Sequence, residues 1–372
     1  MKQVIGKPHQ RLYSLDAIRG FDMFWIMGAE GIFHRLSKIT NVPVWNVLSN
    51  QFNHVEWHGF TFYDLVFPLF LFLAGVSTPF SIGKKIEKGH TKKELLLSII
   101  KRALILIILG VIYNNGLQIR ALSEIRFPSV LGRIALAYMF ANIIYLYTKQ
   151  RAQIIWFAAL LIGYWILLSF ASAPGYPIGD LTMHGNIASY IDSLIVPGKL
   201  YLGVHDPEGI VSTIPAIATG LLGIYTGNLL KNTIIENKKK TAIKIATIGA
   251  ALLIVAQIWN LVFPINKNLW TSSFTLHCGG LSMLLMALFY YIIDVLEYKK
   301  WAFFFKVIGM NSILIYMSGR FIDWSYTTNA IFKWLGQMVG EPYNVVVLAF
   351  CFVLTQWLFL YILYKGRLFL RV

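Results

Sequence analysis

The chain has 372 residues, of which 57% are hydrophobic, 15% aromatic and only 13% charged. A soluble globular protein carries about twice this charged fraction, and a disordered chain is far less apolar. With only Cys278 and Cys351 available to pair, a disulfide scaffold is excluded as well. The net charge of +16 is typical of a nucleic-acid-binding protein in a soluble chain, but here the basic residues lie in short loops between apolar runs. The composition therefore predicts an all-α polytopic membrane protein embedded in a lipid bilayer, with no nucleic-acid partner.

Apolar runs of about 20 residues, long enough to cross the hydrocarbon core as helices, recur along the whole sequence. We predict about ten transmembrane helices in one bundle, at 15–36, 60–82, 97–115, 129–148, 153–171, 211–231, 241–263, 270–294, 302–321 and 344–365. No linker, low-complexity tract or internal repeat divides the chain, which predicts a single domain over 1–372. The longest loop, 172–210, is expected to fold as a cap over the bundle. The first 14 residues lack the apolar core of a removable signal peptide, so we expect the first span to be retained.

The distribution of lysine and arginine among the loops predicts the orientation of the bundle. Basic residues precede the first span, follow the second, sixth and eighth spans, and close the chain: Lys2, Lys7, Arg11, Lys84, Lys85, Lys88, Lys92, Lys93, Lys238, Lys239, Lys240, Lys299, Lys300, Lys365, Arg367 and Arg371. The alternate loops hold fewer basic residues and several acidic ones. By the positive-inside rule, both termini and the basic loops lie in the cytoplasm, and the alternate loops lie outside.

The first span carries several ionisable side chains, which are costly inside a membrane and therefore functional candidates. Asp16, Arg19 and Asp22 are spaced at i, i+3 and i+6, so we expect both carboxylates to reach the guanidinium. Two interpretations are open: a self-neutralised helix end, or a site near the cytoplasm for an anionic group. Glu30 follows Arg19 by 11 residues and about 16 Å, on almost the same predicted helix face. This stripe predicts a polar passage through the bundle.

A loop that contains two histidines leads into the second span. Asp64 precedes Pro68, which cannot donate a hydrogen bond to the Asp64 carbonyl, so we expect a bend and a free acceptor there; alternatively, Asp64 only caps the helix. We predict that His54 is a general base whose ring is oriented by Asp64 or Glu30. His58 is the second histidine of the loop. The loop lacks the zincin spacing and a firm third ligand, so we expect no metal site.

Later segments contribute further polar candidates. Arg133, about one turn into the fourth span, is expected to have an acidic partner in the bundle. Asp206 and Pro207 fit the N-cap and the first position of the sixth helix, while Glu208 and His205 are alternative ligands for a cationic substrate. In the ninth span, two small polar residues either bond to neighbouring helices or line the passage: Asn311 and Ser312.

Six strings occur in order along almost the whole chain: Leu15–Gly20, His54–Pro68, Arg126–Arg133, Asp206–Gly209, Asn266–Trp270 and Gly309–Leu314. Together they resemble the heparan-alpha-glucosaminide N-acetyltransferase family and its bacterial relatives. The sequence departs from the animal enzyme at Glu30 and His58, each of which stands where that enzyme has an asparagine. The resemblance implies a ten-helix membrane acyltransferase that takes acetyl groups from cytosolic acetyl-CoA. It also implies an amino-sugar acceptor on the far side of a bacterial inner membrane, and a homodimer.

By the same resemblance, His54 occupies the position of the catalytic histidine. We expect His54 to deprotonate the amine or hydroxyl of a glucosamine-type sugar, and Arg133 or backbone N–H groups to stabilise the oxyanion. A covalent acetyl-His54 intermediate is the competing mechanism. The remaining candidates fall into two sets: Arg19, Lys84, Lys85, Asn311 and Ser312 for the acetyl-CoA cosubstrate, and His58, Asp206 and Glu208 for the acceptor. An amino-sugar permease that uses the same charges, and a scaffold for periplasmic partners, are the alternative functions.

Overall fold

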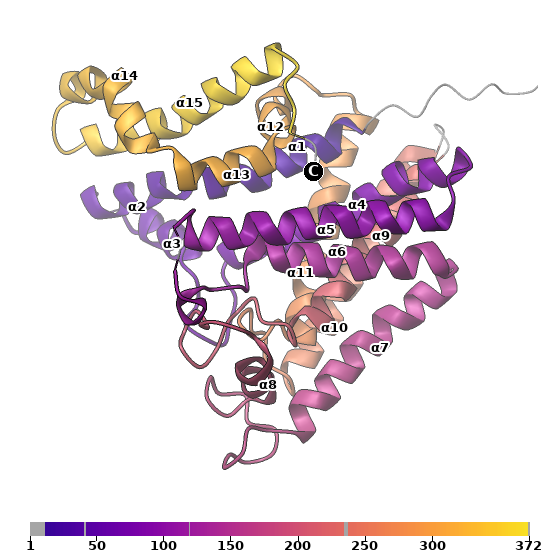
Figure 1. The fold of residues 1–372 in the computed structure, drawn as a ribbon. Helices are drawn as coiled ribbons and strands as arrows, with labels where there is room; N and C mark the ends of the chain where they lie inside the picture. The colour runs from indigo at the N-terminus through magenta and orange to yellow at the C-terminus, as the bar shows by residue number, and fades with distance from the viewer. Residues whose placement is uncertain (1–11, 41, 119, 234–236, 371–372) are drawn as a thin grey trace, which may run out of the picture.

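The computed structural model describes residues 12–40, 42–118, 120–233 and 237–370. Four of the basic residues used to predict the orientation, Lys2, Lys7, Arg11 and Arg371, lie outside these residues. The described chain is almost entirely helical (Figure 1), with a single isolated β-bridge between Arg126 and Gly198 as its only strand-like pairing.

The longest connections between the helices are the loops on either side of α8. In chain order they are α1 (Tyr13–Phe24), the π-helix η1 (Trp25–Ala29), α2 (Glu30–Ile39), α3 (Pro43–Gln51), α4 (Tyr63–Glu87), α5 (Lys92–Asn115), the 3₁₀ turn η2 (Leu122–Glu124), α6 (Val130–Tyr147), α7 (Gln150–Phe170), α8 (Ile187–Ile195), α9 (Thr213–Lys231), α10 (Lys238–Asn260), α11 (Ser272–Tyr290), the π-helix η4 (Tyr291–Val295), α12 (Ala302–Gly309), α13 (Ser312–Phe321), α14 (Trp324–Val339) and α15 (Asn344–Lys365).

Eight helices of the described chain are long and apolar enough to cross a membrane, and the pair α12 and α13, bent by 66° at its break, adds a ninth if it forms one span. These findings confirm the predicted polytopic helical bundle. The predicted first span, 15–36, is not among these nine candidates. In this segment α1 passes through η1 into α2. This segment is helical, but it is interrupted and carries ionisable residues.

The interruption of the first span changes which way its side chains face. Gly28, inside η1, has a φ of 102°, a conformation that glycine adopts readily and other residues rarely do. A π-helical turn also contains more residues than an α-helical turn, so the side chains beyond it are rotated relative to those before it. The prediction that Arg19 and Glu30 share one uninterrupted face was therefore wrong.

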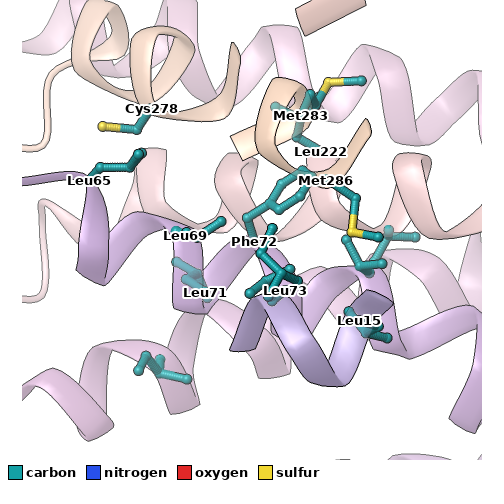
Figure 2. Close-up of a cluster of buried hydrophobic side chains, with 14 of the residues drawn as sticks. Leu15, Leu65, Leu69, Leu71, Phe72, Leu73, Leu222, Cys278, Met283 and Met286 are labelled. Atoms are coloured by element: carbon teal, nitrogen blue, oxygen red, sulfur yellow. The ribbon is translucent and has the colours of Figure 1, made fainter. Parts of the chain in front are cut away.

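The largest buried cluster centres on α4, which continues as one helix through Pro68 and Pro79. Figure 2 shows Leu65 of α4 beside Cys278 of α11, and Phe72 near Leu222 and Met286. These packed apolar side chains hold α4 against α9 and α11. The start of α4, which carries Asp64, is thus fixed in the bundle.

The segment 172–210 contains α8, which lies with its flanking loops at one end of the bundle (Figure 1). The Asp192 carboxylate of α8 accepts hydrogen bonds from the backbone N–H groups of Ile210 and Val211, at 3.0 and 3.1 Å. Ser189, also on α8, contacts the His205 ring at 2.7 Å. These contacts join the segment to the loop that leads into α9.

Candidate active site

The centre of the site is a histidine held by a buried aspartate. His54 lies in the loop between α3 and α4, and its Nδ1 atom is 2.7 Å from Oδ1 of Asp64, in the first turn of α4. The Asp64 side chain is fully buried, whereas half of the His54 side chain is exposed. The other carboxylate oxygen of Asp64 accepts bonds from the backbone and the hydroxyl of Thr61, both at 3.1 Å. If Nδ1 carries the proton donated to Asp64, Nε2 is available as a base. Asp64, and not Glu30, contacts the ring.

A lysine completes this centre. Nζ of Lys267, from the loop between α10 and α11, lies 3.2 Å from Oδ1 of Asp64 and 2.9 and 3.2 Å from the two ring nitrogens of His54. Burial lowers the pKa of Lys267, and the Asp64 charge opposes this shift only in part. Sequence reasoning did not assign Lys267 to the site. The available signal was a lysine in a predicted outer loop, where basic residues are few.

His54 and Lys267 face a cavity of about 220 Å³, which we call the histidine cavity. Glu208 adds a carboxylate to the imidazole and the amine of its wall, and Tyr63 and Tyr316 contribute phenol rings. The remaining lining residues are apolar: Met23, Ile26, Val66, Phe67, Phe70, Val130, Leu131, Ile134 and Ile313. A small apolar chamber with three convergent polar groups is the form expected of a ligand site.

Asp206 and Glu208 belong to an ion-pair cluster beside this cavity. The Arg126 guanidinium binds the Asp206 carboxylate in a bidentate manner, at 2.8 and 2.7 Å, and also contacts Glu208. Burial raises the pKa of Glu208, although Arg133 and Arg126 oppose the shift. The prediction that Asp206 caps the sixth helix was wrong, because α9 begins at Thr213, several residues later. The aspartate is instead used to hold Arg126.

Arg133 is buried in α6 and has no acidic ion-pair partner among the described residues. Its guanidinium donates to the carbonyl oxygen of Gly209 at 3.2 Å, contacts the Ser212 hydroxyl, and lies 4.9 Å from the centre of the Trp270 ring. Arg126 pairs with both nearby carboxylates, those of Asp206 and Glu208. The prediction that Arg133 has an acidic partner was therefore wrong. Arg133 does not line the histidine cavity.

His58 lies apart from the reacting centre. Its Nδ1 atom is 3.2 Å from the side-chain amide of Asn266, and it is not a lining residue of the histidine cavity. His205 is buried beneath α8, and this burial lowers its pKa to about 4. Among the described residues, no group of three or more histidine, cysteine or acidic side chains is placed to hold a metal ion.

A second cavity, of about 200 Å³, adjoins the histidine cavity: Phe70 and Ile313 line both. We call it the Arg19 cavity, because Arg19 and Arg102 provide its charges. Ser312 also lines it. The two cavities therefore follow one another through the bundle, with the basic groups at one end and His54 at the other.

Arg19 does not use both of the aspartates that flank it. It contacts Oδ1 of Asp16 at 3.6 Å and the hydroxyl of Ser77. Both carboxylate oxygens of Asp22 are buried without a hydrogen-bond partner among the described residues, so the predicted pairing of Arg19 with Asp22 was wrong. Helical side chains tilt towards the N-terminus, which directs Arg19 to the preceding turn.

A third cavity, of about 430 Å³, shares Met310 and Phe369 with the Arg19 cavity. We call it the basic cavity, because Lys306, Lys365 and Arg367 line it. The sequence did not predict this cavity, because residues from three separate helices and the C-terminal segment form it. Lys365 and Arg367 served only to predict the orientation of the bundle, and Lys306 was not a predicted site residue. The remaining lining residues are Tyr13, Asp16 and Tyr364.

The other residues predicted to bind the cosubstrate lie outside these cavities. Lys84 and Lys85 are exposed at the end of α4, and Lys85 contacts the Ser98 hydroxyl at 3.5 Å. The side chain of Asn311 bonds to the carbonyl of Leu368 at 2.9 Å and the N–H of Leu370 at 3.0 Å. Asn311 thus fastens the C-terminal segment beside the break between α12 and α13.

Comparison with known proteins finds similarity to two N-acetyltransferases and to one family model. Residues 11–172 match a family model described as a domain of unknown function, DUF5009. Heparan-alpha-glucosaminide N-acetyltransferases of Mus musculus and Homo sapiens are each 28% identical to the chain, over 384 and 383 aligned residues. The chain is a distant relative of these acetyltransferases. This confirms the family resemblance.

The two relatives are longer proteins. The alignments cover 86% of this chain but 56% of each relative, so the chain spans little more than half their length. The region that matches the domain of unknown function contains His54 and Asp64, whereas Lys267 lies beyond it. The relationship therefore extends over most of the helical bundle.

Proposed function

We propose that this protein is a transmembrane acetyltransferase that transfers the acetyl group of acetyl-CoA to a glucosamine-type amino sugar. The observation that carries the proposal is the contact of His54 with Asp64 and Lys267 at a cavity that adjoins the Arg19 cavity, which in turn adjoins the basic cavity. The names of the two mammalian relatives support an N-acetyl transfer. The same geometry accepts a hydroxyl acceptor, which would make the product an O-acetyl sugar.

In this mechanism His54 acts as the general base. Its Nε2 atom takes a proton from the acceptor amine as the nitrogen attacks the thioester carbonyl and a new C–N bond forms. Asp64 stabilises the resulting imidazolium through Nδ1, and the Lys267 ammonium donates a hydrogen bond to the oxyanion. When the C–S bond breaks, the coenzyme A thiolate leaves and takes the proton from Nε2. Lys267 here replaces Arg133, which lies outside the cavity.

The three adjoining cavities offer a path for the donor. The phosphates of the nucleotide fit the basic cavity, where Lys306, Lys365 and Arg367 provide positive charge. The long thiol-bearing arm then runs through the Arg19 cavity, between Phe70 and Ile313, to the histidine cavity. Lys84 and Lys85, predicted as part of this site, have no place in this arrangement.

The positive-inside rule gives the proposal its direction across the membrane. It puts the basic cavity on the cytoplasmic side of a bacterial inner membrane and His54 on the periplasmic side, with both termini in the cytoplasm. A donor that enters from the cytoplasm and an acceptor that arrives from the other side would meet in the histidine cavity. The homodimer implied by the family resemblance belongs to the same proposal.

The test uses purified full-length protein in liposomes, with labelled acetyl-CoA and glucosamine supplied on opposite sides. We expect His54→Ala to reduce acetylation by at least about 10²-fold, because the base is lost. His184→Ala, in an exposed position of the loop before α8, is the matched control. Near-normal turnover of His54→Ala would overturn the proposed role of this residue. Uptake of glucosamine without acetyl-CoA would identify the protein as a permease.

A quench experiment distinguishes direct transfer from an acetyl-His54 intermediate. The protein is mixed with labelled acetyl-CoA in the absence of acceptor and then denatured. Direct transfer predicts no label on the protein. Label that appears on wild type, and not on His54→Ala, would replace general-base catalysis by nucleophilic catalysis at the same residue.

A further inference from the structure

A larger cavity, of about 690 Å³, lies beside the histidine cavity and is not used by the mechanism above. Met23, Ile26 and Tyr316 line both chambers, so the two are adjacent. The large chamber is bordered by η1, the start of α2, α5, the end of α13 and α15. We call it the glutamate cavity, because Glu30 lies in its wall.

The glutamate cavity contains charged groups that the protein leaves available. One carboxylate oxygen of Glu30, Oε2, is buried without a hydrogen-bond partner among the described residues. Arg320, at the end of α13, forms no ion pair within the described part of the chain. Asp323 also lines the chamber, but its Oδ1 atom accepts a bond from the N–H of Tyr326 at 2.9 Å and caps α14. Glu30 and Arg320 therefore remain for a ligand.

An aromatic wall joins the two chambers. The rings of Tyr113 and Tyr316 are stacked, with their centres 4.4 Å apart and their planes at 18°. Both residues line the glutamate cavity, and Tyr316 lines the histidine cavity as well. Because the two rings cover each other's facing sides, the pair presents its outer face, its edges and its hydroxyl groups to a ligand, which suits a sugar unit that has both C–H and hydroxyl surfaces.

We infer that the glutamate cavity is a second acceptor subsite, which binds the sugar unit next to the one acetylated at His54. This inference rests on the proposed function and makes the acceptor an amino-sugar oligosaccharide of at least two units. Glu30 accepts hydrogen bonds from hydroxyl or ammonium groups of the second unit, and Arg320 donates to its oxygen atoms. Glu30, which sequence analysis placed beside His54, thus acts in specificity and not in the proton transfer.

The test compares glucosamine with the β1,4-linked glucosamine disaccharide as acceptors for full-length protein in liposomes. For Glu30→Gln we expect the KM of the disaccharide to rise about tenfold, because a hydrogen bond to a charged group is lost. The KM of glucosamine should stay within about twofold. Glu56→Gln, an exposed carboxylate near His54 that lines neither chamber, is the matched control. Arg320→Gln, at an exposed position, repeats the test if Glu30→Gln does not fold.

Calorimetric binding of the disaccharide to His54→Ala protein separates this inference from the proposed function. Disaccharide binding that is weakened by adding Glu30→Gln or Arg320→Gln supports the subsite, even if wild type transfers no acetyl group. Equal effects of these variants on the two acceptors, or no effect on either, overturn the subsite. In that case acetylation by wild type would still support the proposed function.

Discussion

Lys267 is the residue whose chemistry depends most on its surroundings. Burial lowers its pKa below the ordinary value of 10.5, so the side chain becomes neutral at a lower pH than an exposed lysine does. If the ammonium stabilises the oxyanion, activity must fall as the pH rises through this lowered pKa. Lys267→Arg keeps a positive charge at every accessible pH. We therefore expect the alkaline limb of the kcat/KM profile to move to higher pH in this variant.

The measurement is a pH–rate profile from neutral to alkaline pH for wild type, Lys267→Arg and Lys267→Met. The arginine variant should have a lower maximum, because its planar group fits the site differently, together with a displaced limb. Lys267→Met should lose about 10²-fold or more in kcat at every pH, in the range found when an oxyanion donor is removed. An alkaline limb at the same pH in wild type and Lys267→Arg would exclude Lys267 as the titrating group.

Some contacts of the site could be predicted because they are local in sequence. His54 and Asp64 are separated by 10 residues and lie at the same end of one span, so their pairing follows from the topology. Lys267 is 213 residues away from His54, and only the packing of α11 against α4 brings its loop to the ring. The prediction of an acidic partner for Arg133 failed for a similar reason. Arg126 reaches Asp206 and Glu208, about 80 residues further along the chain, and only the fold shows that it pairs with both.

At the scale of helices, α1 and α12 cross at two glycines. A methyl group added at Gly20 would overlap the carbonyl oxygen of Phe305, and one added at Gly309 would overlap that of Asp16. The backbones are therefore in direct contact, as in small-residue contacts of membrane helices. We expect Gly20→Ala to destabilise the protein by about 1–3 kcal/mol, because the obstructing atoms belong to backbone and must shift.

The stability of Gly20→Ala is measured as the thermal unfolding midpoint in detergent. Gly163→Ala in α7 is the matched control, since a methyl group at Gly163 meets no atom within 4 Å. That control should be neutral or slightly stabilising, because alanine favours helix more than glycine does. Equal midpoints for the two variants would contradict the close approach of α1 and α12.

The long spans could be predicted because a run of apolar residues is sufficient to define them. Their breaks could not, since the π-helical turn at Gly28 and the 66° bend between α12 and α13 depend on the helices packed around them. The helix α14 was not predicted either, because it follows a predicted span without a separate apolar run of membrane length. The π-helical turn and the start of α14 border the glutamate cavity, which is why no sequence pattern revealed it.

At the scale of the whole molecule, the segment 172–210 contains two groups with opposed pH responses. Burial lowers the pKa of His205 from 6.5 to about 4. Between these two pH values the unfolded chain binds the proton and the folded chain does not, so acidification favours the unfolded chain. Asp192 has its pKa raised, chiefly by burial, from 3.8 to about 6, so acidification through that window favours the folded chain. The two effects largely cancel in wild type.

Removing the histidine should expose the response of Asp192. Between pH 7 and pH 4, we expect the unfolding midpoint of His205→Gln to rise relative to wild type, with a relative stabilisation of up to about 3 kcal/mol. The measurement is thermal unfolding in detergent at four or five pH values, with His184→Gln as the control for an exposed histidine of the same segment. Parallel curves for wild type and His205→Gln would show that His205 is not buried as a neutral ring.

The proposed transfer across the membrane depends on the contact between the Arg19 cavity and the histidine cavity. Ile313 lines both, so Ile313→Trp should fill the junction through which the acetyl-bearing arm must pass. We expect acetylation to fall more than tenfold while the basic cavity, which Ile313 does not line, still binds adenosine 3′,5′-bisphosphate as in wild type. Ile108→Trp, on the exposed side of α5, is the matched control and should keep full activity. Normal acetylation by Ile313→Trp would place the donor outside this passage, because a tryptophan at that junction leaves no room for a thioester arm.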